Sequence, residues 1–233
     1  MAFKADLEEE VKKILQTSWK ITGRKVIPNP KDLSLENDAA ELKAAVLYAD
    51  MADSTVLVDR HERSFAAEIY KAYLRLAARI INDEKGKRSI TAYDGDRVMA
   101  VFLGDTKETV AVRCALKINF AVHEIINPLL KKQYPNKKYK LKHVVGIDTS
   151  DLLVARIGVK SVTDLVWVGR AANHAAKLCS RNGEHSIYIT RAVFRAMDDI
   201  VKFEGKKLMW NKENWTERGN RIIYGSSRYL PIK

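Results

Sequence analysis

Two carboxylates at the ends of predicted strands are the residues of this sequence best suited to chemistry. Asp50 ends an apolar run that predicts a buried strand over residues 43–50. Asp96 follows Asp94-Gly95, a dipeptide typical of a hairpin turn. The polar loop 51–55 after the first acid leads into an amphipathic helix, whose first backbone amides have no partner within the helix. A strand that ends in an acid, followed by such amides, can hold a metal and a phosphate together.

The elements between these motifs must bring the two acids together. Apolar periodicity predicts a helix that begins at Ser54 and continues to Asn82, and a second one from residue 105 to about 128. The order of strands and helices within residues 43–160 is β-α-β-β-α-β, which is that of a ferredoxin-like split βαβ core. We therefore predict an α+β fold, with an antiparallel-rich sheet, helices on one face, an N-terminal helix and a C-terminal hairpin. The strands expected in the core and after it lie at 43–50, 88–94, 97–103, 139–148, 151–158 and 164–168.

Two regions are expected along the chain. Residues 1–42 comprise an amphipathic helix near 3–18 and a turn-rich connector, an arm suited to packing or to contact with a second subunit. Residues 43–233 form the main domain, and its motifs lie within 43–180.

Composition limits the class of protein. The chain has 233 residues, of which 30% are charged and 46% hydrophobic, as in a soluble globular domain. It has neither an apolar run of membrane-spanning length nor a signal peptide, and its two cysteines, Cys114 and Cys179, are far apart. We therefore expect a cytoplasmic protein. The net charge of +12 favours an anionic partner but does not choose among nucleotide, nucleic acid and lipid, and no nucleic-acid module accompanies it.

In the expected topology the first strand and the central hairpin are neighbours, so Asp50 and Asp96 converge at one edge of the sheet. Two carboxylates repel each other unless divalent cations lie between them. A pair of such cations supports in-line attack of a hydroxyl on a phosphate. For each acid alone the structural alternative is simpler: a helix cap for Asp50 and an ordinary hairpin residue for Asp96.

Four segments, in this order and at these separations, resemble the class III nucleotidyl cyclase catalytic domain. The similarity covers about residues 43–180. The N-terminal helix, the PNPKDLSLENDA segment and the IIYGSSRYL ending are most similar to the uridylate cyclases of bacterial Pycsar antiphage systems. The four segments are VLYADMADST (46–55), YDGDRVMAVF (93–102), VVGIDTSDLLVARIG (144–158) and VWVGRAANHAAKL (166–178).

The resemblance implies a role for each motif residue. Asp50 and Asp96 fall on the two metal-binding aspartates, and the carbonyl of Met51 falls on the backbone metal ligand. Asn173 and Lys177 fall on the N-x-x-x-R pair that orients the ribose and stabilises the pentavalent phosphate; lysine keeps the charge but lacks the planar fork of arginine. The backbone amides expected to cradle the triphosphate are those of Ala52, Asp53, Ser54 and Thr55.

Base recognition departs from the adenylate cyclases. The positions of their adenine-reading lysine and its partner are Ala92 and Val166 here, and neither side chain can hydrogen-bond a base. A smaller base read by other groups is the alternative. Tyr48 shares a strand face with the first metal aspartate, and Arg97 suits the acceptor-rich edge of a pyrimidine. Both also have structural alternatives, as a core aromatic and a surface charge.

The resemblance implies a homodimeric pyrimidine nucleotide cyclase that converts UTP to 3′,5′-cyclic UMP and pyrophosphate with two Mn²⁺ or Mg²⁺ ions per site. Each site would be shared between subunits, and the product would act on a separate effector in antiphage defence. The alternatives are an adenylate or cytidylate cyclase with atypical base recognition and a catalytically silent nucleotide-binding homologue. Nucleic-acid binding driven by charge is a third.

Overall fold

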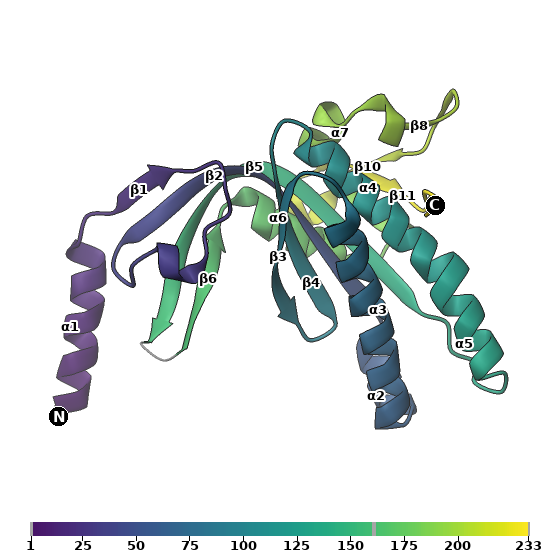
Figure 1. The fold of residues 1–233 in the computed structure, drawn as a ribbon, viewed down its shortest axis with the longest axis horizontal. Helices are drawn as coiled ribbons and strands as arrows, with labels where there is room; N and C mark the ends of the chain where they lie inside the picture. Colours follow the sequence, from purple (N-terminus) through teal and green to yellow (C-terminus); the bar gives the residue numbers. More distant parts are fainter. Residues whose placement is uncertain (1, 160–161, 233) are drawn as a thin grey trace.

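The computed structural model describes residues 2–159 and 162–232. Within these residues a nine-stranded mixed sheet has the order β10-β11-β7-β5-β2-β4-β3, with β1 paired to β2 and β6 paired to β5 (Figure 1). Its strands are β1 (Lys20–Gly23), β2 (Asp38–Ala52), β3 (Lys87–Asp94), β4 (Arg97–Leu103), β5 (Lys142–Val159), β6 (Val162–Val168), β7 (Ile187–Thr190), β10 (Asn211–Trp215) and β11 (Arg221–Ser226). A separate small hairpin joins β8 (Phe203–Glu204) to β9 (Lys207–Leu208).

Apart from the N-terminal helix, the described α-helices lie between these strands in sequence. The described helices are α1 (Ala2–Gln16), α2 (Ser54–Arg60), α3 (Arg63–Asp83), α4 (Lys107–Phe120), α5 (Asn127–Gln133), α6 (Arg170–Cys179) and α7 (Arg191–Ala196). Of these, α3, α4 and α6 pack on the sheet. A π-helix, Ala121–Ile126, joins α4 to α5, and three short 3₁₀ helices lie at Pro30–Asp32, Asp199–Val201 and Thr216–Arg218. The expected α+β class and the order of the core elements are confirmed.

Helices cover both faces of the central sheet, not one face as the sequence analysis expected. One core packs α3 and α4 against β2 residues such as Leu47 and Ala49. The other core packs α6 against Val46 and Ala44, which point to the opposite face. A central strand buried on both sides is apolar at consecutive positions, which explains the unbroken run Ala44–Leu47 in β2.

Other differences concern the lengths of elements. β2 begins at Asp38 and β5 is a single strand through Thr149 and Ser150, because the two pair with each other along their length, from Ala39–Ala155 to Ala52–Lys142. The predicted end of the second helix near Pro128 is wrong. The helix passes into a π-helical turn and continues to Gln133, and the proline lies in the first turn of α5, where its missing N–H is tolerated.

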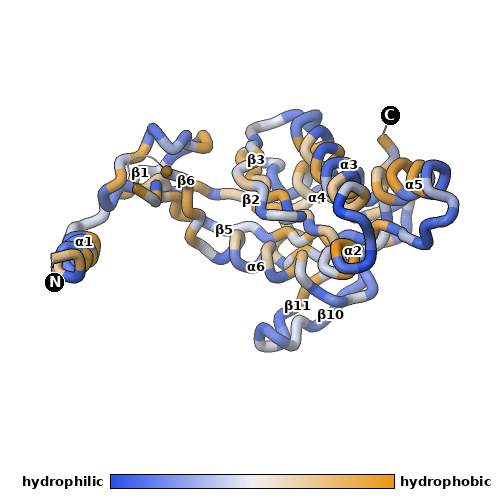
Figure 2. Tube along the Cα trace, turned by 90° about the horizontal axis from the view of Figure 1, so that it is seen from below, coloured by the Kyte–Doolittle hydropathy of each residue, from blue (hydrophilic) through white to orange (hydrophobic). Residues whose placement is uncertain are grey.

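The N-terminal helix α1 lies away from the rest of the chain in both views (Figures 1 and 2). It has no buried residue, although Phe3, Leu7, Val11 and Ile14 form an apolar stripe along it. Its C-terminal end is held by Asn37, whose Nδ2 donates to the carbonyls of Ile14 and Thr17. Among the described residues, no helix is both long enough and apolar enough to cross a membrane.

Candidate active site

Asp50 and Asp96 lie next to each other at the end of the β2–β4 ladder. Asp50 is directly opposite Arg97 in the antiparallel register. The backbone N–H of Met51 points to the carbonyl of Asp96, with an N–O distance of 3.4 Å. The tight β3–β4 turn that allows this uses Gly95 at a φ of 60°, a left-handed conformation that glycine adopts without strain.

The Asp50 carboxylate has the electrostatic character of a cation-binding group. Burial, together with the neighbouring Asp96 charge, raises its pKa to about 6, and the nearby Arg97 only partly offsets these two effects. Its Oδ1 atom is buried and has no hydrogen-bond partner among the described residues. A buried carboxylate oxygen without a donor, beside a second carboxylate, fits a hard divalent cation.

Beyond these two carboxylates, other metal ligands would have to be groups other than protein side chains. Among the described residues, no group of three or more His, Cys, Asp or Glu side chains is arranged to hold a metal. Two carboxylates therefore leave further coordination positions for backbone carbonyls, water or a substrate phosphate, as hard cations that bind nucleotides require. Met51, whose carbonyl the sequence analysis assigned to the metal, follows Asp50 in β2.

The loop expected to hold phosphates leads from β2 into α2. Asp53 precedes the first helical residue in a left-handed conformation, with a φ of 59°. Its carbonyl accepts the N–H of Leu57, so the amides of Ser54 and Thr55 come before the first bond of the helix. Its carboxylate lies 3.9 Å from the Lys142 ammonium, which brings a positive charge to this loop.

Asn173 and Lys177 lie on the exposed face of α6, one turn apart. The opposite face packs closely on β5, because a Cβ at Gly146 would lie 2.2 Å from the Ala175 carbonyl. A buried carboxylate also orients the start of this helix. Asp148, which is 0% exposed, lies 3.3 Å from Arg170 Nε and 3.2 Å from His174 Nδ1.

A cavity of about 650 Å³ collects residues that the sequence analysis assigned to base and ribose. Arg97 from β4 and Asn173 and Lys177 from α6 all line it. The sequence analysis missed two further cations of this wall, Arg181 and Arg218. They follow α6 and precede β11, and no local motif marks either of them.

A smaller cavity, of about 330 Å³, adjoins the first through Arg97 and Ala176, which line both. Tyr48, Ala92 and Met99 form its apolar wall. The Arg97 guanidinium is held here by an ion pair of 2.8 Å with Asp94. The structure thus brings Tyr48, Arg97, Asn173 and Lys177 onto one concave surface, whereas Val166 lies on β6, opposite Ala155, and lines neither cavity.

Comparison with solved structures identifies the fold. The chain superposes on the guanylyl cyclase Cya2 with a TM-score of 0.68 and 17% identity, covering 82% of this chain and 94% of that one. The adenylyl cyclase CyaB from P. aeruginosa gives a TM-score of 0.64 and 18% identity, covering 84% and 97%. The fold is therefore that of the class III nucleotidyl cyclases.

Sequence relatives narrow the class to a family. The chain is 46% identical to a uridylate cyclase of Xanthomonas perforans, over 97% of both chains. It is 48% identical to a uridylate cyclase of Burkholderia cepacia, covering 94% of this chain and 95% of the relative. A scan against models of protein families found no match. The chain belongs to the uridylate cyclase family, which confirms the expected resemblance and makes it a nucleotidyl cyclase.

Proposed function

We propose that this chain converts UTP to 3′,5′-cyclic UMP and pyrophosphate. The observation that carries the proposal is the Asp50–Asp96 pair, in which a buried carboxylate oxygen lies beside a second acid and has no donor within residues 2–159 and 162–232. Such a pair suits two divalent cations, Mn²⁺ or Mg²⁺, which would lower the pKa of the ribose 3′-hydroxyl and stabilise charge on the α-phosphate. The relatives at 46% and 48% identity supply the class of base.

The residues of the chain would divide the remaining work. Asn173 would hold the ribose, and the Lys177 ammonium would stabilise the negative charge that develops on the α-phosphate. The amides from Ala52 to Thr55 would bind the triphosphate at the start of α2. Asp50 and Asp96 with the Met51 carbonyl would position the metal ions.

Base selection would follow from hydrogen-bond donors. The Arg97 guanidinium carries only donors, and it lies in the smaller cavity beside Tyr48. Uracil presents a carbonyl oxygen at the position where cytosine and adenine present an amino group. Arg97 would therefore favour uracil over both, and Tyr48 would stack on the ring. Ala92 in the same wall offers no hydrogen bond to adenine.

The active form would be a homodimer with two shared sites. Neither cavity that holds Asn173, Lys177 or Arg97 is lined by Asp50 or Asp96. In the cyclases that this chain resembles, one subunit supplies the metal-binding acids and the other supplies the ribose-binding residues, so a second copy would complete each site. A two-fold axis would generate two equivalent sites.

The test is a product assay with purified chain, Mn²⁺ and each of ATP, GTP, CTP and UTP in turn. We expect cyclic UMP and pyrophosphate from UTP, with the other three nucleotides turned over much more slowly. Preferred turnover of ATP or CTP would replace the uridylate assignment with an adenylate or cytidylate cyclase. Binding of nucleotide without release of pyrophosphate from any of the four would identify a catalytically silent homologue. Lys177 is the feature that supports this alternative, because it replaces the arginine of the N-x-x-x-R pair.

The biological setting follows from the same resemblance. Cyclic UMP made by this chain would act as a second messenger in antiphage defence, on a separate effector protein. Infection of cells with and without the gene, with cyclic UMP measured over time, tests this role. A rise in cyclic UMP after infection that requires Asp96 is the expected result.

A further inference from the structure

A chain of buried polar side chains leads to the backbone of Asp50. Tyr73 of α3, His143 of β5 and Asn119 of α4 are 1%, 4% and 0% exposed. The Tyr73 hydroxyl lies 3.3 Å from His143 Nδ1, and His143 Nε2 lies 2.9 Å from the Oδ1 atom of Asn119. The same hydroxyl lies 3.4 Å from the carbonyl oxygen of Asp50. Polar groups at such depth are costly unless each finds a partner, and here they partner one another.

The far end of this chain determines which atoms donate. Asn119 Nδ2 donates to the carbonyls of Ser227 and Arg228, each at 3.0 Å, and carbonyl oxygens only accept. The amide is therefore oriented with its Oδ1 toward His143, where it accepts the Nε2 proton. Burial lowers the pKa of the His143 imidazole to about 3, so the ring is neutral near pH 7 and its Nδ1 accepts.

Tyr73 is consequently the donor at the other end. A tyrosine hydroxyl is protonated near pH 7, so it has a hydrogen to donate. That O–H lies between two acceptors, His143 Nδ1 and the Asp50 carbonyl. The rings of Tyr73 and His143 also meet edge to face, with centroids 5.7 Å apart, which restricts the phenol to this position.

The Asp50 carbonyl belongs to the peptide that also carries the N–H of Met51. In a trans peptide the C=O and the N–H point in opposite directions from one rigid plane. Here the C=O meets the Tyr73 hydroxyl and the N–H meets the Asp96 carbonyl. The plane between the two metal-binding acids is thus held from both sides, and Tyr73 is the only side chain of the three buried ones that touches it.

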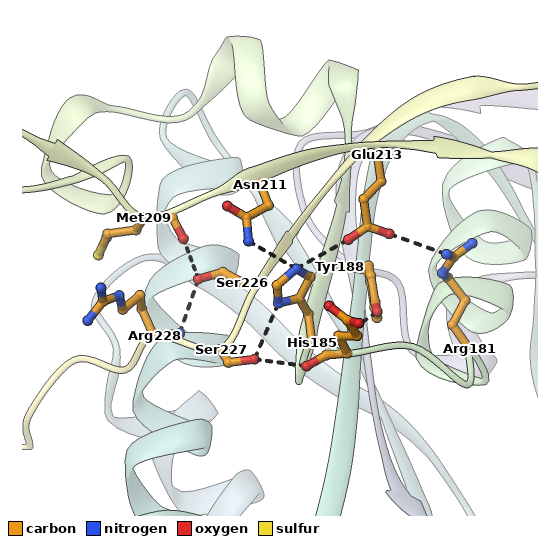
Figure 3. A network of polar contacts seen from close by, with 10 residues as sticks. Arg181, His185, Tyr188, Met209, Asn211, Glu213, Ser226, Ser227 and Arg228 are labelled. Atoms are coloured by element: carbon orange, nitrogen blue, oxygen red, sulfur yellow. Dashed lines mark hydrogen bonds and ion pairs between the residues drawn. The ribbon is translucent and has the colours of Figure 1, made fainter.

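The C-terminal segment that accepts from Asn119 is itself well anchored (Figure 3). Ser226 Oγ donates to the Met209 carbonyl and accepts the N–H of Arg228. Ser227 Oγ lies 3.4 Å from His185 Nδ1, and the other nitrogen of that ring is 3.3 Å from the Glu213 carboxylate. The polar chain therefore ends on a fixed support rather than in solvent.

We propose that Tyr73 is a positioning residue of the metal site, which orients the Asp50–Met51 peptide so that the Asp50 carboxylate and the Met51 carbonyl face the same cations as Asp96. The proposal rests on the proposed function, because it needs the metal site. Asn119 and His143 support the phenol in turn, so the same orientation depends on residues of three different elements, α3, α4 and β5.

The experiment measures Mn²⁺ affinity without turnover. Mn²⁺ is titrated into the full chain in the presence of 3′-deoxy-UTP, which has no 3′-hydroxyl and cannot cyclise. Electron paramagnetic resonance follows the free Mn²⁺. Tyr73→Phe removes only the hydroxyl. The matched control is Thr109→Val, which removes another buried hydroxyl, one that accepts the Asp198 N–H at 2.9 Å and is remote from this chain of contacts.

We expect Tyr73→Phe to raise the Mn²⁺ dissociation constant about 3- to 10-fold, somewhat less than the loss typical for groups that contact a ligand side chain directly. With saturating Mn²⁺ the KM for UTP should stay within about twofold of wild type, since the hydroxyl does not touch the nucleotide. Thr109→Val should leave Mn²⁺ affinity unchanged, even if its melting temperature falls as much as that of Tyr73→Phe.

Two results would overturn the proposal. If both variants lose stability and neither changes Mn²⁺ affinity, Tyr73 is structural only, and cyclic UMP formation by the wild type leaves the proposed function intact. If the wild type itself binds no Mn²⁺ with nucleotide, the metal site and Tyr73's role fall together. A His143→Gln, Tyr73→Phe double variant adds a check. Because the two residues belong to one hydrogen-bonded series, the double variant should lose less Mn²⁺ affinity than the sum of the two single losses in binding free energy.

Discussion

Asp50 of β2 lies directly opposite Arg97 of β4, so the residue before that arginine, Asp96, is held beside the first acid. One register of one ladder thus brings two carboxylates and a guanidinium to the same corner of the sheet. A shift of one residue in this pairing would turn the Asp50 side chain to the face covered by α3 and α4. The alignment of β2 with β4 therefore decides whether the corner can bind a cation.

Removal of the second acid should abolish turnover without unfolding the protein. We expect Asp96→Ala to lower kcat at least about 100-fold, because charge stabilisation at the reacting phosphate would be lost. Asp96 is only half-buried in a hairpin turn, so the circular dichroism spectrum and the melting temperature of the variant should match those of wild type. Asp83→Ala, at the exposed end of α3, is the control. Wild-type turnover in Asp96→Ala would refute the metal assignment.

Shared sites predict complementation between inactive variants. Asp96→Ala and Asn173→Ala should each be inactive as homodimers. In a mixed dimer one of the two sites has both an intact metal side and an intact ribose side, so random mixing should restore about one quarter of wild-type activity. Pyrophosphate release after unfolding and refolding the two variants together measures this. No recovery would place both groups in a single-chain site.

Arg97 should govern the affinity for UTP. A hydrogen bond to a charged group contributes about 1.5–3 kcal/mol, so Arg97→Ala should raise the KM for UTP roughly tenfold or more. The preference for UTP over CTP should narrow, because the group that distinguishes a carbonyl from an amino group is removed. Arg75→Ala, on the exposed side of α3, should leave both unchanged. An unaltered ratio of kcat/KM for UTP and CTP in Arg97→Ala would exclude this residue from base recognition.

The close contact of α6 with β5 should make Gly146 intolerant of any side chain. In Gly146→Ala the added carbon would meet the Ala175 carbonyl at 2.2 Å and the Cys179 nitrogen at 2.5 Å, and both are backbone atoms. Overpacking of this kind costs about 1–3 kcal/mol of unfolding free energy and should displace Asn173 and Lys177, lowering kcat. Gly23→Ala, where nothing lies within 4 Å, is the matched control in urea unfolding. Equal stability of the two variants would contradict the packing.

His143 should make the protein less stable in mild acid. Burial lowers its pKa to about 3, whereas an unfolded histidine titrates near about 6.5, so between these values the unfolded chain binds the extra proton. Stability therefore falls as the pH decreases through this window, by up to about 1.4 kcal/mol per pH unit. The raised pKa of Asp50 acts with the opposite sign, in wild type and variant alike.

The comparison of His143→Gln with wild type isolates this contribution. Between about pH 6.5 and about pH 4.5, the unfolding free energy of the variant should fall less steeply as the pH decreases. The difference between the two slopes should approach the value for one proton taken up on unfolding. Urea titrations at several pH values measure both slopes. Parallel curves would show that the imidazole is not held neutral in the folded state.

Much of the site is local in sequence. Asp50 and Asp96 are predicted as the metal-binding acids because each ends or adjoins a strand, and both positions are visible in the pattern of apolar residues. The spacing of Asn173 and Lys177 predicts one helix face, and the structure has both on the exposed side of α6. His143 also carried a signal, since it alternates with Val145 and Ile147 on a core-facing side of β5, where a polar residue must find a partner.

The sequence by itself determined the α+β class and the order of the core elements, and it proposed the two acids, because these depend on short-range periodicity and on motifs at fixed spacing. Only the tertiary structure decided that α6 covers the second face, that Asp148 orients it, and that Tyr73 reaches the Asp50 backbone. These contacts join residues far apart in the chain, such as Asn119 and Ser227, 108 positions apart. No local pattern encodes them, since they depend on how whole elements pack.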